Sequence, residues 1–172
     1  ARGATRLARR MHPFTVETQI ARPREEIFDY LADVANHPEF TDHFLTEWRM
    51  TREDTFGLGA GGRFHADLPF SRFGWGDWTI VDADRPEALV LQGRAGKFNR
   101  IRTLTVFELR EGPDGATRVA LTVETQPRYP TDKFLESLGQ RRSLKRHWSK
   151  ALRRLRGILE EDRDRGARAT IA

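Results

Sequence analysis

The sequence predicts a single α+β domain, in which one antiparallel sheet of seven strands is combined with two short helices and a long C-terminal helix. One alternating segment precedes two short helical patterns, and six further alternating segments follow them, separated by short turns. The C-terminal part of the chain then contains few helix breakers. Short turns between consecutive strands favour an antiparallel sheet over a parallel one.

The first strand is predicted at residues 14–20, where apolar or β-branched side chains alternate with polar ones. Pro23 occupies a favourable first position for the helix that follows, and Glu25 and Glu26 complement its N-terminal dipole. A second short helix can begin at Asn36, because Pro38 follows two residues later. These signals predict the order strand, helix, helix.

The remaining strands are predicted from alternating segments bounded by glycine, proline and aspartate turns. They span residues 45–51, 62–70, 75–83, 89–95, 100–111 and 116–126. The last helix is predicted to begin at Pro130 and Thr131 and to end near Asp164. We place the domain at residues 13–164, with a disordered basic tail or misassigned start at residues 1–12 and a disordered C-terminus at residues 165–172.

Composition narrows the function classes. The absence of cysteine excludes disulfides, thiolate metal sites and cysteine nucleophiles. Apolar runs are far shorter than the roughly 20 residues that cross a membrane, and we expect a cytoplasmic protein. Residues 131–156 carry nine Lys and Arg against two Asp and Glu. The cations of this helix either form an ordinary solvated face or bind a membrane, a ribosome or RNA. Nucleic acid is disfavoured, because proteins that bind single strands interleave aromatic residues with their cations, and here only Trp148 lies among them.

Residues 21–34 (ARPREEIFDYLADV) and 36–40 (NHPEF) resemble the opening signature of the START and polyketide cyclase/dehydrase (SRPBCC) superfamily. Three later features agree with this resemblance: the glycine-rich residues 57–62, the WTI at residues 78–80 before an acidic turn, and the FE at residues 107–108 that leads into GATRV. The first signature is also similar to the coenzyme Q-binding subgroup, although the Gly-Pro-Phe segment expected on a central strand of that subgroup is missing.

The resemblance implies a helix-grip fold, in which a curved sheet wraps around the C-terminal helix and encloses a deep apolar cavity. It implies binding or transport of a hydrophobic small molecule that is lipid, isoprenoid or polyketide-like. Two alternatives stay open: a polyketide aromatase/cyclase or dehydratase that uses the same cavity, and the interaction module described above. Fold alone does not decide between them.

Strand alternation predicts which side chains face the cavity. The predicted ligand-binding residues of the sheet are Trp48, Met50, Phe64, Leu68, Trp78, Ile80, Leu91, Thr103, Thr105, Phe107 and Leu121. Thr103 and Thr105 are the expected polar anchors. An ordinary packed core explains any single residue of this set equally well, because pockets are themselves mostly apolar.

The last helix adds Phe134 and Leu138 to the predicted cavity, on an apolar stripe that continues to Trp148. Arg141 and Lys145 fall within the same stripe. Because a buried cation needs a partner, an acidic head group on the ligand would suit both. The alternatives are a kink near Gly139 that exposes the two cations, or simple snorkelling of their side chains.

The sequence predicts no catalytic residue, no metal site and no cofactor. No pair of the five histidines has metal-ligand spacing, and no serine lies in a nucleophile elbow. Phosphate loops and dinucleotide fingerprints are also absent from the sequence. An enzyme is therefore disfavoured, although a cyclase could use Arg141, Tyr30 or His43 for proton transfer.

Overall fold

The computed structural model describes residues 13–69, 74–126 and 139–170. Its seven antiparallel strands form one sheet in the order β1-β7-β6-β5-β4-β3-β2. The strands are β1 (Phe14–Ile20), β2 (Leu45–Met50), β3 (Gly61–Ala66), β4 (Trp75–Asp84), β5 (Ala88–Ala95), β6 (Ile101–Glu111) and β7 (Thr117–Gln126). The helices are α1 (Arg24–Ala32), α2 (His37–Thr41) and α4 (Arg141–Glu161), with short 3₁₀ turns η1 (Val34–Asn36), η2 (Lys97–Asn99) and η3 (Pro113–Gly115). The predicted α+β fold is confirmed.

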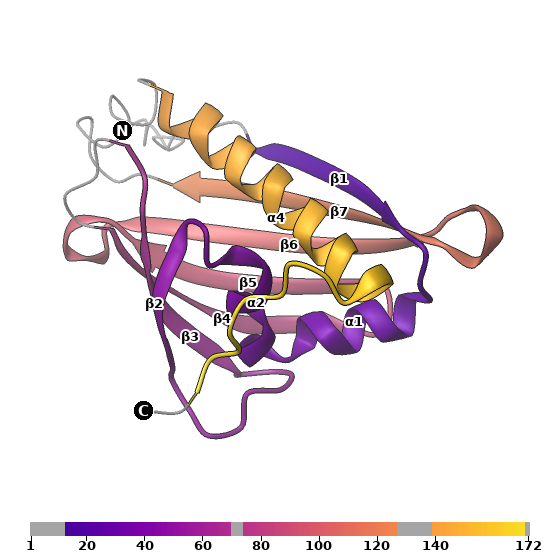
Figure 1. The fold of residues 1–172 in the computed structure, drawn as a ribbon. Helices are drawn as coiled ribbons and strands as arrows, with labels where there is room; N and C mark the ends of the chain where they lie inside the picture. The colour runs from indigo at the N-terminus through magenta and orange to yellow at the C-terminus, as the bar shows by residue number, and fades with distance from the viewer. Residues whose placement is uncertain (1–12, 70–73, 127–138, 171–172) are drawn as a thin grey trace, which may run out of the picture.

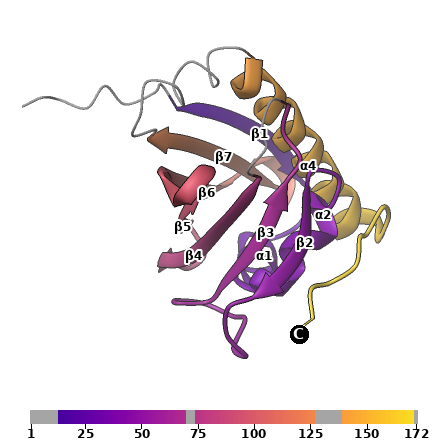
Figure 2. The same cartoon turned by 90° about the vertical axis from the view of Figure 1, so that its left-hand side faces the viewer.

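The sheet curves around α4, which lies across its concave face beside β1 (Figures 1 and 2). Trp148, Leu152 and Leu155 of α4 are buried in the same core as Val16 and Ile20 of β1. Buried and exposed residues alternate along β1, β4 and β7, as the sequence predicts. This alternation gives the concave face its apolar side chains.

An irregularity in β2 keeps its large side chains on the concave face. The pairing of β2 with β3 shifts between Thr46 and Arg49, and Glu47 adopts a left-handed backbone conformation with φ 51°. An extra residue in one strand resets its alternation. Leu45 is therefore buried, and both Trp48 and Met50 also pack against the core.

Gly93 allows β5 to pass close to β4. It lies opposite Trp78, and a Cβ atom at this position would overlap the backbone oxygen of Asp77. We therefore expect Gly93→Ala to lower the free energy of unfolding by about 2 kcal/mol, as overpacking does elsewhere. Urea unfolding measures this effect, and Gln92→Ala, at an exposed position of the same strand, is the control. Equal stability of the two variants would contradict the steric argument.

The segment after α4 contacts the domain, while the predicted disorder of residues 165–172 stays a prediction. Helix α4 ends at Glu161, and Asp162 follows it in a left-handed conformation. The chain then turns back and runs beside α2 (Figure 1, yellow). The backbone N–H of Gly166 donates to Glu39 O at 2.8 Å, and that of Ala169 donates to Ala35 O at 3.0 Å. Backbone hydrogen bonds of this kind, rather than apolar burial, hold residues 165–170 against the domain.

Candidate ligand-binding cavity

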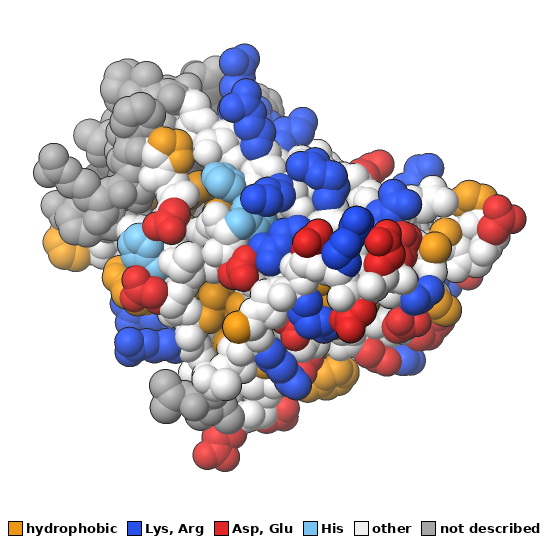
Figure 3. Space-filling view, in the orientation of Figure 1, with side chains coloured by type: hydrophobic (Ala, Val, Ile, Leu, Met, Phe, Trp, Pro, Cys, Tyr) orange, Lys and Arg blue, Asp and Glu red, His pale blue; other side chains and the backbone are white. Residues whose placement is uncertain are grey.

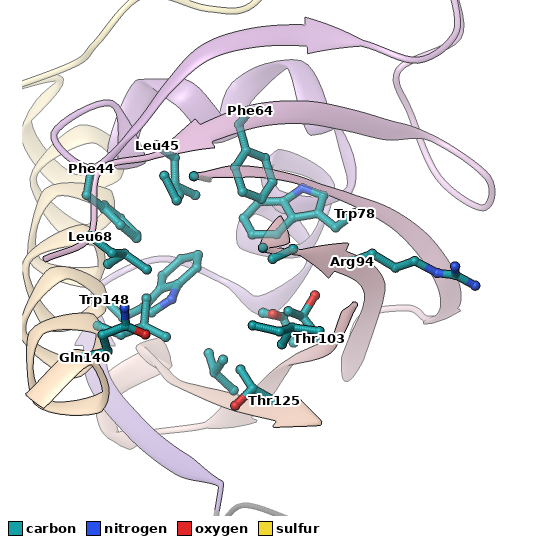
Figure 4. Close-up of a pocket in the computed structure, with 18 of the residues that line it drawn as sticks. Phe44, Leu45, Phe64, Leu68, Trp78, Arg94, Thr103, Thr125, Gln140 and Trp148 are labelled. Atoms are coloured by element: carbon teal, nitrogen blue, oxygen red, sulfur yellow. The ribbon is translucent and has the colours of Figure 1, made fainter. Parts of the chain in front are cut away.

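A cavity of about 150 Å³ lies between the concave face of the sheet and the first turns of α4. It sits at the end of the sheet where β5 meets β6 and where α4 begins, and Figure 4 shows side chains from both directions pointing into it. Ala95, Ile101 and Thr125 come from strand ends, and Gln140 and Leu144 come from the start of the helix. The cavity therefore depends on the long helix packing across a curved sheet.

Aromatic rings form one wall of the cavity. The ring of Phe64 on β3 lies 4.7 Å from that of Trp78 on β4, measured between centroids. Trp148 of α4 continues the wall, 5.9 Å from Trp78 and 5.2 Å from Phe44. Gly76 leaves room for Phe64, because a Cβ at Gly76 would lie 3.0 Å from the Phe64 ring. Such a wall favours flat or apolar ligands.

Three threonines line the cavity from β6 and β7. Thr103 and Thr105 alternate on β6, and Thr125 extends the same face on β7; Figure 4 shows Thr103 and Thr125 on the side of the cavity opposite Phe64. Thr105 is only 4% exposed. None of the three hydroxyls has a hydrogen-bond partner among the residues that the structure describes. Each hydroxyl can both donate and accept, so the three are available to a polar group of a ligand.

Charged groups lie at the rim of the cavity. Arg141 lines it yet is exposed, and its Nη2 donates to Pro13 O at 3.0 Å. Arg94 also contributes to the lining, but its guanidinium points away from the centre of the cavity (Figure 4). Asp77 accepts the backbone N–H of Arg94 at 3.1 Å. Arg141 is thus the cation best placed to meet a ligand.

The cavity brings together part of the predicted set. Six predicted residues line it: Phe64, Leu68, Trp78, Thr103, Thr105 and Arg141. Four others are fully buried in the adjoining core: Ile80, Leu91, Phe107 and Leu121. Trp48 and Met50 are half-buried against that core, whereas Lys145 is exposed on α4 and outside the lining. Phe134 and Leu138 lie outside the described residues. A role in ligand binding stays a prediction for all of these residues.

Several lining residues were absent from the predicted set. Val123 and Thr125 continue the inward alternation of β7 beyond Leu121, so strand parity could have found them. Phe44 and Leu45 follow α2, and Phe14 begins β1. Strand parity also marks Phe14, the first buried position of β1, whereas Phe44 and Leu45 reach the cavity only through the tertiary fold.

Tyr30 and His43, considered above for proton transfer, lie outside the cavity lining. The Tyr30 hydroxyl donates to Glu39 Oε2 at 2.6 Å, and burial together with this carboxylate raises the pKa of Tyr30 far above its usual value. His43 Nε2 donates to His147 O at 3.1 Å. Burial lowers the pKa of His43 to about 4. Both side chains stabilise the packing of α2 against its neighbours.

The described residues contain no group of three or more His, Asp or Glu side chains arranged to hold a metal ion. No helix in the described ranges is long and apolar enough to cross a membrane.

The comparisons with known proteins agree with this geometry. Norcoclaurine synthase from Thalictrum flavum matches with a TM-score of 0.66 and 11% identity, over 88% of this chain and 96% of the synthase. TTHA0849 from Thermus thermophilus matches with a TM-score of 0.65 and 14% identity, over 84% and 94%. Ms6760 from Mycobacterium smegmatis matches with a TM-score of 0.61 and 16% identity, over 87% and 91%. At sequence identities this low, the structural similarity shows that the chain shares the fold of these proteins.

No curated protein sequence matches the chain. Residues 11–160 match the family described as polyketide cyclase / dehydrase and lipid transport. This match covers most of the chain and confirms the predicted SRPBCC superfamily, while the similarity to the coenzyme Q-binding subgroup stays a prediction. The family supports a general role in binding hydrophobic ligands. The chain therefore belongs to the polyketide cyclase / dehydrase and lipid transport family.

Proposed function

We propose that this protein binds and carries a hydrophobic small molecule that is lipid, isoprenoid or polyketide-like. The observation that carries the proposal is an apolar, aromatic cavity whose three threonine hydroxyls have no hydrogen-bond partner among the described residues. Ligand pockets combine these two features, a mostly apolar lining and a few polar groups that orient the ligand. The family match supports the same role.

The size of the cavity indicates how a ligand would be held. A volume of about 150 Å³ accommodates roughly one benzene ring, whereas most ligand sites have about 300–1,000 Å³. The enclosed part would therefore take a ring or a short branched segment. The rest of a larger ligand would extend through the mouth, past Arg141, where an acidic head group would find a cation.

The cyclase or dehydratase alternative needs a general acid or base next to the ligand. The ionisable side chains in the described lining are Asp77, Arg94 and Arg141. Arg94 and Arg141 are exposed, and Asp77 is half-buried at the rim. The deeper lining is built from aromatic, aliphatic and threonine side chains, which favours binding over chemistry.

Fluorescence titration with phenylnaphthylamine, a neutral apolar dye, tests the proposal. We expect saturable binding of one dye per chain, with competition by long-chain fatty acids that reach the same cavity. A signal that rises linearly with dye and never saturates would contradict an internal binding site.

A second titration tests the acidic head group. Anilinonaphthalene sulfonate adds an anion to nearly the same ring system, so Arg141→Ala should weaken its binding about threefold to fivefold, in keeping with an exposed ion pair. Binding of neutral phenylnaphthylamine should stay unchanged. Arg142→Ala is the matched control, because Arg142 is exposed, adjacent in sequence and outside the lining. Equal weakening of both dyes by Arg141→Ala would remove the head-group proposal and leave the carrier proposal intact.

A further inference from the structure

A row of four cations covers the exposed side of α4. Arg142, Arg146, Lys150 and Arg153 recur at spacings of four, four and three residues, and all four are exposed. Such spacings place side chains on one face of a helix. Figure 3 shows basic side chains gathered along this helix. We call these four residues the cationic stripe.

The cationic stripe is not neutralised by the described part of the protein. None of its four side chains forms an ion pair or hydrogen bond with a described residue. Other cations of α4 behave differently, because Arg154 pairs with Asp42 and Arg156 pairs with Glu160. Like charges three or four residues apart destabilise a helix by about 0.2–0.5 kcal/mol per pair. The stripe is therefore a surface that an anionic partner would stabilise.

The cationic stripe begins next to the mouth of the cavity. Gln140, Arg141 and Leu144 line the cavity, and the first member of the stripe, Arg142, lies among them in sequence. At 1.5 Å per residue the stripe extends about 16 Å along the helix. The β5–β6 turn also borders the mouth through Gly96 and Ile101, and Phe98 at its tip is 82% exposed. An exposed aromatic ring at the cavity mouth suits the interface of a lipid bilayer.

Base-stacking groups are missing from the stripe. Trp148 is buried in the core, and His147 stacks on Phe44. Proteins that bind single-stranded nucleic acid interleave exposed aromatic residues with their cations. An anionic lipid surface needs only the charge, with a contribution of about 1 kcal/mol from each Lys or Arg near it.

We propose that the cationic stripe docks the protein on anionic lipid membranes, with the cavity mouth next to the bilayer. The use of this docking for ligand exchange rests on the proposed carrier function, but the docking itself does not. It also explains why cations accumulate on α4, whose first turns close the cavity.

Flotation with lipid vesicles tests the docking. The protein should bind vesicles that mix phosphatidylserine with phosphatidylcholine, and should bind phosphatidylcholine alone far more weakly. Changing all four stripe residues to Gln should lower the partition coefficient on the order of a thousandfold at low salt. The control removes four exposed cations from the outer side of the sheet, with Arg49, Arg102, Arg110 and Arg118 changed to Gln. This control should bind within about threefold of the unchanged protein, because its lost charges lie away from the proposed surface.

Three results would overturn the proposal. The first is an equal loss of vesicle binding in the stripe variant and the sheet control, which would reduce the effect to net charge. The second is equal binding to vesicles with and without phosphatidylserine. The third is tighter binding of a single-stranded RNA oligonucleotide than of vesicles at the same salt, lost in the stripe variant, which would make the stripe a nucleic-acid site. Phenylnaphthylamine binding by the stripe variant separates the two proposals, because the cavity should still fill when docking is lost.

Discussion

Thr103→Phe should weaken phenylnaphthylamine binding by about thirtyfold or more while the protein stays folded. Thr103 lies on β6 and lines the cavity, where it is half-buried. A phenyl ring at this position would occupy most of a volume of about 150 Å³, because a cavity of this size holds roughly one benzene. If one aromatic ring of the dye can no longer be buried, binding loses about 2 kcal/mol, which corresponds to about a thirtyfold weaker affinity.

The matched control is Arg102→Phe, at the neighbouring exposed position of the same strand. It introduces the same side chain on the outer side of the sheet and should leave dye binding unchanged. Circular dichroism and urea unfolding establish that both variants are folded. Unchanged dye affinity in folded Thr103→Phe would place the hydrophobic site elsewhere on the protein.

Acid should destabilise the fold through His37. This side chain is fully buried, and its Nε2 donates to Leu31 O at 2.7 Å, while Nδ1 has no hydrogen-bond partner in the part of the chain that the structure describes. The rings of Phe40, Trp48 and Trp78 surround it. Burial lowers the pKa of His37 to about 4, because the charged imidazolium would lose its hydration in this apolar site.

The direction of the effect follows from proton uptake. In the unfolded chain His37 has a pKa near 6.5 and binds a proton as the pH falls below that value, whereas in the folded protein it stays neutral down to about pH 4. The free energy of unfolding should therefore be highest above pH 6.5 and fall by about 3 kcal/mol between pH 6.5 and pH 4. Below pH 4 this contribution should change no further.

His37→Gln isolates this contribution, because the amide can still donate to Leu31 O but does not titrate. The free energy of unfolding, measured at several pH values between 7 and 4, should fall less in the variant than in the unchanged protein. The pKa of His43 is also lowered, but His43 and the carboxylates titrate in both proteins. Their contributions therefore cancel when the two pH profiles are subtracted. Parallel pH profiles for the two proteins would show that His37 does not control acid stability.

The sheet and the aromatic wall of the cavity were accessible to sequence reasoning because they depend on local patterns. Phe64 lies at an inward position of β3, and Trp78 lies in the part of β4 that alternates regularly, before the register shift after Ile80, so parity predicts their placement on the cavity side. Thr103 and Thr105 follow the same rule on β6. The turn residues between the strands predicted most strand ends to within a few positions of where the structure has them.

The charges of α4 were harder to place. Projection of Arg141 and Lys145 onto the apolar stripe assumed a straight helix across Gly139. In the structure Gly139 has φ 107°, and α4 begins only at Arg141. Arg141 then reaches the rim of the cavity, and Lys145 faces solvent. Within α4, Arg141 and Lys145 lie on the helix face that carries Trp148 and Leu152, but both are exposed on the first turns of the helix.

The contacts of the C-terminal segment could not be predicted, because its partners are distant in sequence. Arg165 forms an ion pair with the buried Glu39, which also accepts the Tyr30 hydroxyl, and Arg168 pairs with Asp33. Residues 165–170 contain too little apolar surface to predict burial, and composition alone indicates disorder. Only the fold shows the carboxylates that hold this segment in place.

Native mass spectrometry of the purified protein, before and after organic extraction, tests the central claim most directly. We predict an adduct of defined mass that extraction removes, that returns when the extract is added back, and that is missing from Thr103→Phe. An unliganded mass before extraction, with no adduct after addition of long-chain fatty acids or isoprenoid alcohols, would contradict a hydrophobic ligand in the cavity.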